Sequence, residues 1–360
     1  MKLLLSILLW SFIAHAQSLE FFDYVGPDVG RVKIRVDDET NSLPGPVVDV
    51  GATDFTIEFW MKASPVNDQP AVTCGANVNW IYGNIMFDRD RYNQDRKFGL
   101  SIAGGRIVFG VSGNGTGDRT LCGVTTVNDN QWHHVAVARR RSDGFMYLFV
   151  DGNLEASVNG PDGDISYPDN GIPGNYCNGP CDYSDPFIVL GVEKHDADPA
   201  NYPGFTGLLT ELRLSDTLRY INDYAVPSAR FTSDARTLGL YHFTEGAGDT
   251  LHDTSNHPQG PNHAVRYFGG SPQAPLWSSE SPFAETQLPA IDDLTITVEN
   301  NVATLRWSAV PGAVNYLIYS GSAFDFTPPD EGEQVGATAM SEFSFDLGAN
   351  VFSNIRVIAE

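Results

Sequence analysis

Carboxylates gather in two stretches of the chain whose spacing could hold a cation. Residues 193–198 read EKHDAD and follow the apolar run 187–191, so Glu193, Asp196 and Asp198 would lie at the end of a buried strand. Asp162 and Asp164 alternate in the same way at the start of a long stretch rich in proline, glycine and asparagine. Oxygen ligands presented by loops suit Ca²⁺. We therefore expect a calcium site from these five residues, and the alternative is a solvated acidic surface, because the EF-hand spacing is absent.

A third polar stretch, residues 87–97 (FDRDRYNQDRK), packs alternating charges into what should be one loop. Asp88 and Asp90 could bind the hydroxyl groups of a ligand, and Tyr92 could supply a flat platform for stacking. We expect this loop to contact a glycan. The alternative is a hairpin end whose charges pair with one another at the surface, where such pairs contribute little stability.

Signatures of catalysis are sparse. His133 and His134 are consecutive in an alternating run, so their side chains point to opposite faces of a strand and cannot converge on one ion. Glu58 is the only carboxylate within residues 55–61, and the Gly-x-Ser-x-Gly elbow of hydrolases is absent from the sequence. We therefore predict no catalytic residues and no organic cofactor.

The four cysteines are Cys74, Cys122, Cys177 and Cys181. An exported chain would oxidise them, and four cysteines allow three pairings. Cys177 and Cys181 are close in sequence, so we expect them to pair and to leave Cys74 to pair with Cys122. A zinc site is the weaker alternative, because one Cys-x₃-Cys motif stands alone.

Composition limits the possible compartment and partners. The chain has 360 residues and a net charge of −23, which disfavours nucleic acid and anionic membranes as partners. Residues 1–16 have a lysine, an apolar run too short to span a membrane, and a small-residue end, which is typical of a signal peptide. We expect a protein that is secreted, or held at the cell surface or in the periplasm, without membrane insertion.

Short alternating runs must position these residues. Residues 31–36, 54–61, 131–138 and 208–214 alternate with the period of half-buried strands. Glycines at 104–105, 144 and 152 predict tight turns between neighbouring strands. After a polar linker at 281–289 the pattern restarts at 294–298, 302–307 and 316–319. The chain thus predicts an all-β protein with two domains.

The first of these domains resembles the laminin-G-like, concanavalin-A-like jelly-roll family. The resemblance rests on residues 55–60 (FTIEFW), 132–137 (WHHVAV), 148–152 (LFVDG), 205–214 (FTGLLTELRL) and 241–248 (YHFTEGAG). It implies ligand binding rather than catalysis. One departure is Thr210, which stands where the family usually has an aspartate before the residue matching Glu211. If that aspartate is a calcium ligand in relatives, this chain has lost it or binds metal differently.

The second domain resembles a fibronectin type III module. The resemblance rests on Leu305, Trp307, Tyr316 and Tyr319 with a Pro-Gly pair between them. It covers about 70 residues, and Ile355 stands where such modules usually place a tyrosine. We expect the last strand of the module to be missing or supplied by something else.

These observations give one interpretation and two alternatives. We expect a signal peptide at 1–16, an antiparallel jelly-roll β-sandwich at 17–280, a linker at 281–289 and a smaller Ig-like or fibronectin III-like β-sandwich at 290–360. The expected function is non-catalytic binding or adhesion to a glycan or an extracellular protein. The alternatives are a glycan hydrolase or lyase of the concanavalin A-like superfamily and a purely structural surface protein.

Overall fold

The structure of the chain is a computed structural model. It describes residues 16–23, 30–37, 42–91, 93–169, 186–195, 200–283, 291, 293–300, 302–310, 316–321, 333–346 and 354–359. The chain divides into two units, one at His15–Phe283 and one that includes all residues from Ala284 onward. No helix among the described residues is long and apolar enough to cross a membrane.

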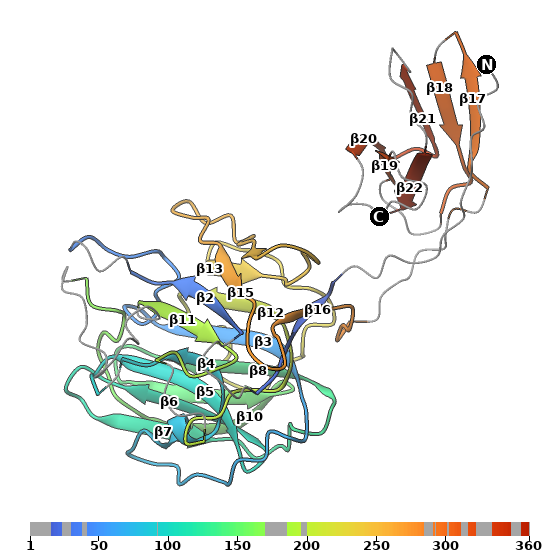
Figure 1. Cartoon of the computed structure of the whole chain (residues 1–360). Coiled ribbons are helices and arrows are strands. Elements are labelled where there is room, and N and C mark those ends of the chain that lie inside the picture. Colours follow the sequence, from blue (N-terminus) through green and yellow to red (C-terminus); the bar gives the residue numbers. More distant parts are fainter. Residues whose placement is uncertain are drawn as a thin grey trace. The chain divides into compact units, whose positions relative to one another are not determined.

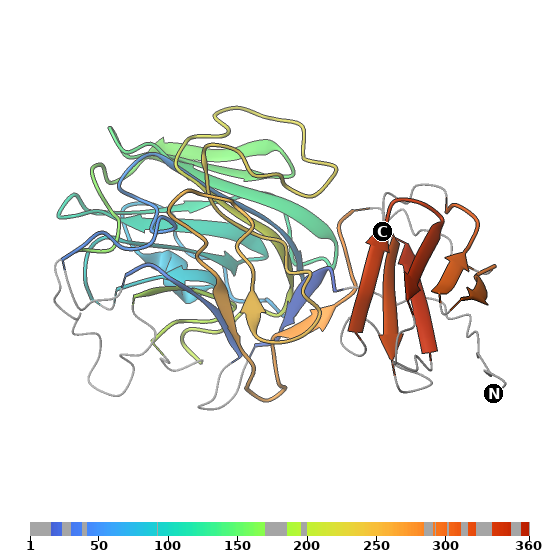
Figure 2. The same cartoon turned by 90° about the horizontal axis from the view of Figure 1, so that it is seen from above.

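The first unit is built from two antiparallel sheets that stack face to face (Figures 1 and 2). Sheet A contains, in spatial order, β10 (Asn153–Asn159), β9 (Phe145–Val150), β8 (Trp132–Arg139), β3 (Phe55–Ala63), β12 (Gly207–Ser215), β1 (Ser18–Phe21) and β16 (Leu276–Ser278), and β13 (Thr237–Tyr241) also pairs with β12. Sheet B contains β14 (Thr250–Leu251), β15 (Ala264–Tyr267), β2 (Arg31–Arg35), β11 (Phe187–Leu190), β4 (Asn84–Arg89), β5 (Lys97–Ala103), β6 (Arg106–Ser112) and β7 (Asp118–Cys122). The expected all-β sandwich is confirmed.

Alternation along the strands decides which side chains fill the space between the sheets. In β3, Phe55, Ile57 and Phe59 lie in the core, whereas Glu58 lies on the opposite, outer face of sheet A. One apolar cluster takes residues from both sheets, as burial of two facing apolar surfaces requires. The period-2 pattern of the sequence therefore predicted the inward face of this strand correctly.

The predicted tight turns are present. β5 and β6 pair across Gly104 and Gly105, and β8 pairs with β9 across a turn in which Gly144 has φ +67°. Asp151 and Gly152 join β9 to β10 with φ values of 50° and 76°. Two consecutive positive φ values are the geometry of a type I′ hairpin.

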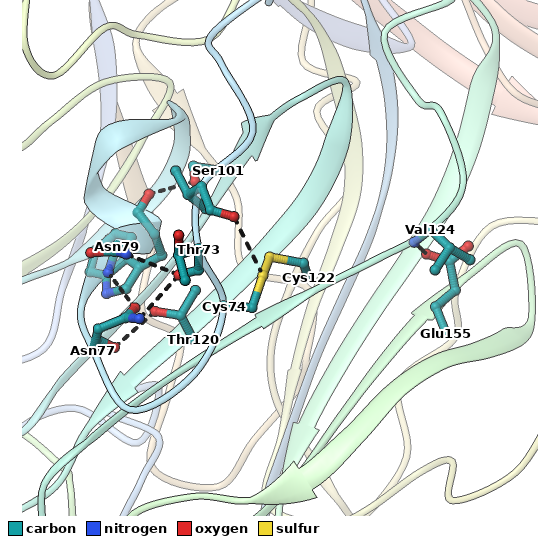
Figure 3. The surroundings of a disulfide bond; sticks show 11 residues. Thr73, Cys74, Asn77, Asn79, Ser101, Thr120, Cys122, Val124 and Glu155 are labelled. Carbon is teal, nitrogen blue, oxygen red and sulfur yellow. Dashed lines mark hydrogen bonds between the residues drawn. A yellow bond between two sulfur atoms is a disulfide. The ribbon is translucent and has the colours of Figure 1, made fainter.

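A disulfide bond clips a loop onto the outer face of sheet B. Cys74 pairs with Cys122 at the end of β7, which confirms that prediction (Figure 3). Beside it, Asn77 Nδ2 donates to the Thr73 carbonyl (3.0 Å) and Thr120 Oγ1 donates to the Asn77 carbonyl (2.9 Å). The predicted partners Cys177 and Cys181 lie outside the described residues. By loop-closure entropy, a bridge across 48 residues contributes about 4 kcal/mol of stability.

The clipped loop carries Trp80 within a short 3₁₀ helix, η1 (Asn79–Tyr82). Trp80 is fully buried and lies against Gly99 and Gly110, where an added Cβ would come within 2.2 and 1.8 Å of the indole. Ser101 Oγ also donates to the Trp80 carbonyl (2.5 Å). Only residues without a Cβ at these two positions thus leave room for the indole.

The described residues of the second unit form two three-stranded antiparallel sheets. One orders as β17 (Thr295–Glu299), β18 (Val302–Arg306) and β21 (Glu342–Asp346), and the other as β20 (Glu333–Thr338), β19 (Tyr316–Gly321) and β22 (Asn354–Ala359). Leu305, Trp307, Val310, Tyr316 and Ile318 form its buried core. Three of these strands are those predicted at 294–298, 302–307 and 316–319. The resemblance to fibronectin type III remains a proposal.

Candidate functional site

A row of cross-strand neighbours runs over the outer face of sheet B. Asp88 in β4 lies opposite Val189 in β11, Val189 lies opposite Lys33 in β2, and Lys33 lies opposite Val265 in β15. Directly opposed residues share one face of a sheet. On the other side Asp88 lies opposite Gly99, which Trp80 covers. The register therefore places Asp88 in one row with Lys33 and Val265, two and three strands away on the same surface, although the sequence separates them by 55 and 177 residues.

The turn after β11 folds back over this row. Gly191 begins the turn with φ +94°, and a Cβ there would come within 2.3 Å of the Phe21 ring. The Lys194 backbone N–H donates to Asp88 Oδ2 (3.0 Å), and Lys194 Nζ donates to the Phe187 carbonyl (3.2 Å). Asp88 is consequently buried beneath the turn.

Around Asp88 lies a group of charged side chains that we call the Asp88 cluster: Asp88, Asp90, Lys97, Glu193 and His195. His195 Nδ1 donates to Glu193 Oε1 (2.8 Å) and lies 3.7 Å from Asp90 Oδ2. Lys97 Nζ lies 3.0 Å from Asp90 Oδ1. The Asp90 backbone N–H donates to Asp88 Oδ1 (2.6 Å). Three carboxylates, one imidazole and one ammonium group are thus fixed within one small region.

Burial and mutual repulsion set the protonation of the cluster. Burial, with the negative charges of Asp90 and Glu193, raises the pKa of Asp88 to about 7. Burial disfavours the charged form of His195, but its hydrogen bond to Glu193 and the charges of Glu193 and Asp90 outweigh burial and raise its pKa. The cluster therefore favours a cationic His195 between the carboxylates of Asp90 and Glu193. The side chains of Asp90 and Glu193 remain 14% and 12% exposed to solvent.

The structure brings together three residues that the sequence assigned to two different sites. Asp88 and Asp90 were expected in a glycan-binding loop, and Glu193 was expected among calcium ligands. Asp88 instead belongs to β4 and is covered by the 191–195 turn, because cross-strand pairing with Val189 extends the sheet through it. The expected position of Asp88 in a loop is therefore wrong. Tyr92, Asp196 and Asp198 lie outside the described residues.

The two remaining predicted calcium ligands have other partners. Asp164 Oδ2 lies 3.2 Å from Arg96, and Asp164 Oδ1 accepts hydrogen bonds from the Ser166 backbone N–H and hydroxyl (2.8 and 2.7 Å). The backbone carbonyl of Asp162 accepts from the Thr116 hydroxyl (3.3 Å). Within the described part of the chain, no group of three or more His, Cys, Asp or Glu side chains could hold a metal ion. The calcium site stays a prediction.

Sequence reasoning missed a second polar network, on the outer face of sheet A. Glu58 is fully buried and accepts hydrogen bonds from Arg213 Nε (2.9 Å) and the Tyr220 hydroxyl (3.0 Å), and His134 Nε2 lies 3.5 Å away. Burial opposes ionisation of Glu58, but the nearby imidazole of His134 and the charge of Arg213 hold its pKa below the usual value. Alternation placed Glu58 on this face, but nothing in the sequence indicated that the segment after β12 would cover it.

Glu211 occupies the β-bulge of this network, with φ +54°. Its carboxylate accepts from Arg230 (2.5 Å), from the Phe231 backbone N–H (2.8 Å) and from His242 Nδ1 (2.9 Å). At Thr210, where relatives were expected to have an aspartate, the hydroxyl lies within hydrogen-bonding distance of the Gln17 and His242 carbonyls (2.7 and 2.9 Å). Thr210 therefore stabilises the fold by linking these two backbone segments.

The two histidines of the 131–138 run separate as predicted. His133 contacts Asp151 (2.7 Å) and Asp129 (3.1 Å), whereas His134 Nδ1 lies 2.9 Å from the Tyr224 hydroxyl on the outer face of sheet A. The two imidazoles have different partners.

The family model that the chain matches lies within the first unit. Residues 37–219 match the family model Laminin_G_3, described as the concanavalin A-like lectin/glucanases superfamily. A Rattus norvegicus protein named Sushi, von Willebrand factor type A, EGF and pentraxin domain-containing protein 1 is 27% identical over 164 residues, which is 45% of this chain and 4% of that protein. The chain thus spans a small part of that relative's length.

Two solved structures are similar at low identity. A putative carbohydrate binding protein from Bacteroides ovatus is 14% identical with a TM-score of 0.39, over 75% of this chain and 62% of that chain. Domains LG4-5 of the mouse laminin alpha1 chain are 10% identical with a TM-score of 0.35, over 90% of this chain and 60% of that chain.

Proposed function

The chain belongs to the concanavalin A-like lectin/glucanase superfamily through residues 37–219, and from this we propose that it is an exported, non-catalytic carbohydrate-binding protein. The observation that carries the proposal is the position of the Asp88 cluster. Its two carboxylates that reach solvent, Asp90 and Glu193, are fixed by ion pairs and hydrogen bonds on the outer face of sheet B, which also carries the cationic and aromatic side chains of β2, β11 and β15. Preorganised polar groups beside aromatic rings suit the hydroxyl groups and apolar faces of a sugar.

The partners of the buried carboxylates favour binding over hydrolysis. Glycoside hydrolysis needs two carboxyl groups that flank a glycosidic bond, roughly 5–9.5 Å apart and open to substrate. Glu58 and Glu211 are fully buried, and each is bonded to an arginine. Their arrangement stabilises the covered face of sheet A and leaves neither carboxylate open to a glycan.

Export and calcium remain parts of the proposal that rest on the sequence. The expected signal peptide lies almost entirely outside the described residues, as do Asp196 and Asp198. We propose that any calcium bound by Glu193, Asp196 and Asp198 would lie beside the Asp88 cluster, because Glu193 belongs to both groups. The second unit would act as a spacer or attachment module.

A glycan array probed with the mature full-length chain tests the proposal. We expect retention on a defined set of glycans and no new reducing ends after prolonged incubation with the same glycans. Parallel arrays with Ca²⁺ and with chelator test the calcium proposal alone. Cleavage of a bound glycan would favour the hydrolase or lyase alternative, and binding to no glycan would favour a protein ligand.

A further inference from the structure

β2 turns three cationic side chains to the outer face of sheet B. Val32 and Ile34 are fully buried in the core. The alternation of a strand therefore directs Arg31, Lys33 and Arg35 to the opposite face. The chain has 22 Lys and Arg residues against 45 Asp and Glu residues. Three cations at alternate positions of one short strand are thus a local exception in an acidic protein.

Aromatic rings from both neighbouring strands lie between these cations. Lys33 Nζ is 4.7 Å from the ring centre of Tyr267 in β15 and 5.6 Å from that of Phe187 in β11. Arg35 Cζ is 4.7 Å from the Phe187 ring centre. Cations over ring faces at these distances are held in place by the ring quadrupole. The contacts therefore preorganise the positive groups.

This part of the outer face reaches solvent, unlike the parts beneath Trp80 and the 191–195 turn. Tyr267 is 45% exposed and Val265 is 41% exposed, and Arg35 is also exposed. We call the surface formed by Lys33, Arg35, Phe187, Val265 and Tyr267 the β2–β15 face. Exposed apolar rings rimmed by charges mark a binding surface more often than isolated apolar residues do.

We propose that the β2–β15 face binds a short acidic oligosaccharide through its carboxylate groups, an inference that rests on the proposed carbohydrate-binding function. The guanidinium of Arg35 can pair with a carboxylate through two parallel hydrogen bonds. Lys33, two residues away on the same face of β2, supplies a second positive charge. Tyr267 and Val265 offer an apolar surface to the C–H face of a sugar ring.

Charge complementarity selects this ligand class over the others. A long polyanion such as nucleic acid would meet the acidic remainder of the chain, whose net charge is −23. A short acidic oligosaccharide would experience mainly the local field, since charges separated by more than about 8 Å are screened at physiological salt. A neutral glycan would leave the cations of β2 without a role in binding.

Calorimetric titration of the full-length mature chain with three trisaccharides tests the inference. A galacturonic acid trimer should bind, whereas a galactose trimer of the same length should bind at least about tenfold more weakly, since each charge-assisted pair adds that much or more. Arg35→Gln and Lys33→Gln should each weaken binding of the galacturonic acid trimer by about tenfold or more. A sulfated galactose trimer should bind less tightly than the galacturonic acid trimer, and tighter binding would overturn the assignment to carboxylates.

Arg106→Gln is the matched control. Arg106 is an exposed arginine at the start of β6, four strands away from β2, so the same loss of charge should leave the affinity unchanged. Equal weakening by Arg106→Gln, or equally tight binding of a poly-glutamate peptide, would show unspecific charge attraction and overturn the inference. Tyr267→Phe should retain the stacking surface and Tyr267→Ala should lose it, with melting curves confirming that each variant folds.

The result separates this inference from the proposed function. Binding of a neutral glycan that is unaffected by Arg35→Gln and Lys33→Gln would leave the carbohydrate-binding function in place and overturn the role of the β2–β15 face. Failure to bind any glycan on the array would overturn the function itself.

Discussion

Asp49 is a buried carboxyl group whose ionisation the fold opposes. Its Oδ2 accepts a hydrogen bond from the Tyr167 backbone N–H (2.7 Å), but its Oδ1 is shielded from water and has no hydrogen-bond partner among the described residues. Burial raises the pKa of Asp49 to about 8, and the positive charge of Arg89 offsets only part of this effect. A carboxylate held in this way lowers stability whenever it is ionised.

The raised pKa of Asp49 gives a pH prediction with a definite sign. Between the ordinary value of 3.8 and about 8, the unfolded chain has lost the Asp49 proton while the folded chain keeps it, so stability falls as pH rises through this window. Asp49→Asn should remove the contribution of this one proton. The free energy of unfolding should then fall less steeply with pH, by about 1.4 kcal/mol per pH unit. Urea unfolding at pH 5, 6, 7 and 8 measures the slope.

The Asn side chain suits the same position, because its carbonyl can still accept from Tyr167. A residual slope should remain in Asp49→Asn, since burial also raises the pKa of Asp88 to about 7. Parallel curves for the wild type and the variant would contradict the prediction.

The sequence identified residues of the candidate site but not their grouping. Asp88, Asp90 and Glu193 were selected from their types and spacing. Their meeting depends on the pairing of β4 with β11, strands about a hundred residues apart, and a one-residue slip of register would move Asp88 to the other face. Single-sequence spacing contains no information on such long-range register. His195 was missed for the same reason, because only its contact with Glu193 and Asp90 distinguishes it.

At the scale of elements, alternation of apolar and polar residues predicted the strands. It did not predict the loops and segments that cover the outer faces of the two sheets. β3, β8 and β12 follow their expected runs because one face of each is apolar at every second residue. The loop that bears Trp80 and the segment after β12 have no such period. They attach to the outer faces through single side chains and particular glycines, and pattern reasoning does not detect those contacts.

The packing of Trp80 against Gly99 in β5 and Gly110 in β6 predicts how a substitution at Gly110 changes stability. Gly110→Ala should destabilise the chain by about 1–3 kcal/mol, because its new Cβ would lie 1.8 Å from Trp80 Cδ1 and the fully buried indole has no room to move. Trp80→Ala should itself lower stability by about 3–5 kcal/mol. In the Trp80→Ala background, Gly110→Ala should have little further effect.

This double-mutant cycle, measured by urea unfolding, uses Trp80→Ala as the matched control. If Gly110→Ala destabilised both backgrounds equally, the effect would come from the strand itself and not from the contact with the indole.

At the scale of the whole molecule, the two units differ greatly in the size of their cores. The first unit buries one large cluster drawn from both sheets, whereas the core of the second has, among the described residues, five buried residues and six partly buried ones. The second unit has six strands among the described residues, and β22 pairs with β19 alone. An unpaired strand edge is a surface that proteins normally cover.

This difference predicts that the second unit is marginal by itself. Residues 288–360 expressed alone should melt well below the full-length chain, because a small core offsets chain entropy poorly and the free edge of β22 has no partner strand among the described ones. Hydrogen exchange of peptides covering β18 and β19 should be faster than exchange of peptides covering β3 and β12, whose strands contribute to the large core. Residues 16–283, expressed as the matched control, should retain the main melting transition of the full chain, since the large core lies entirely within them. A fragment 288–360 that melts cooperatively at the temperature of the full chain, or exchange in β18 and β19 that is as slow as in β3 and β12, would contradict the prediction.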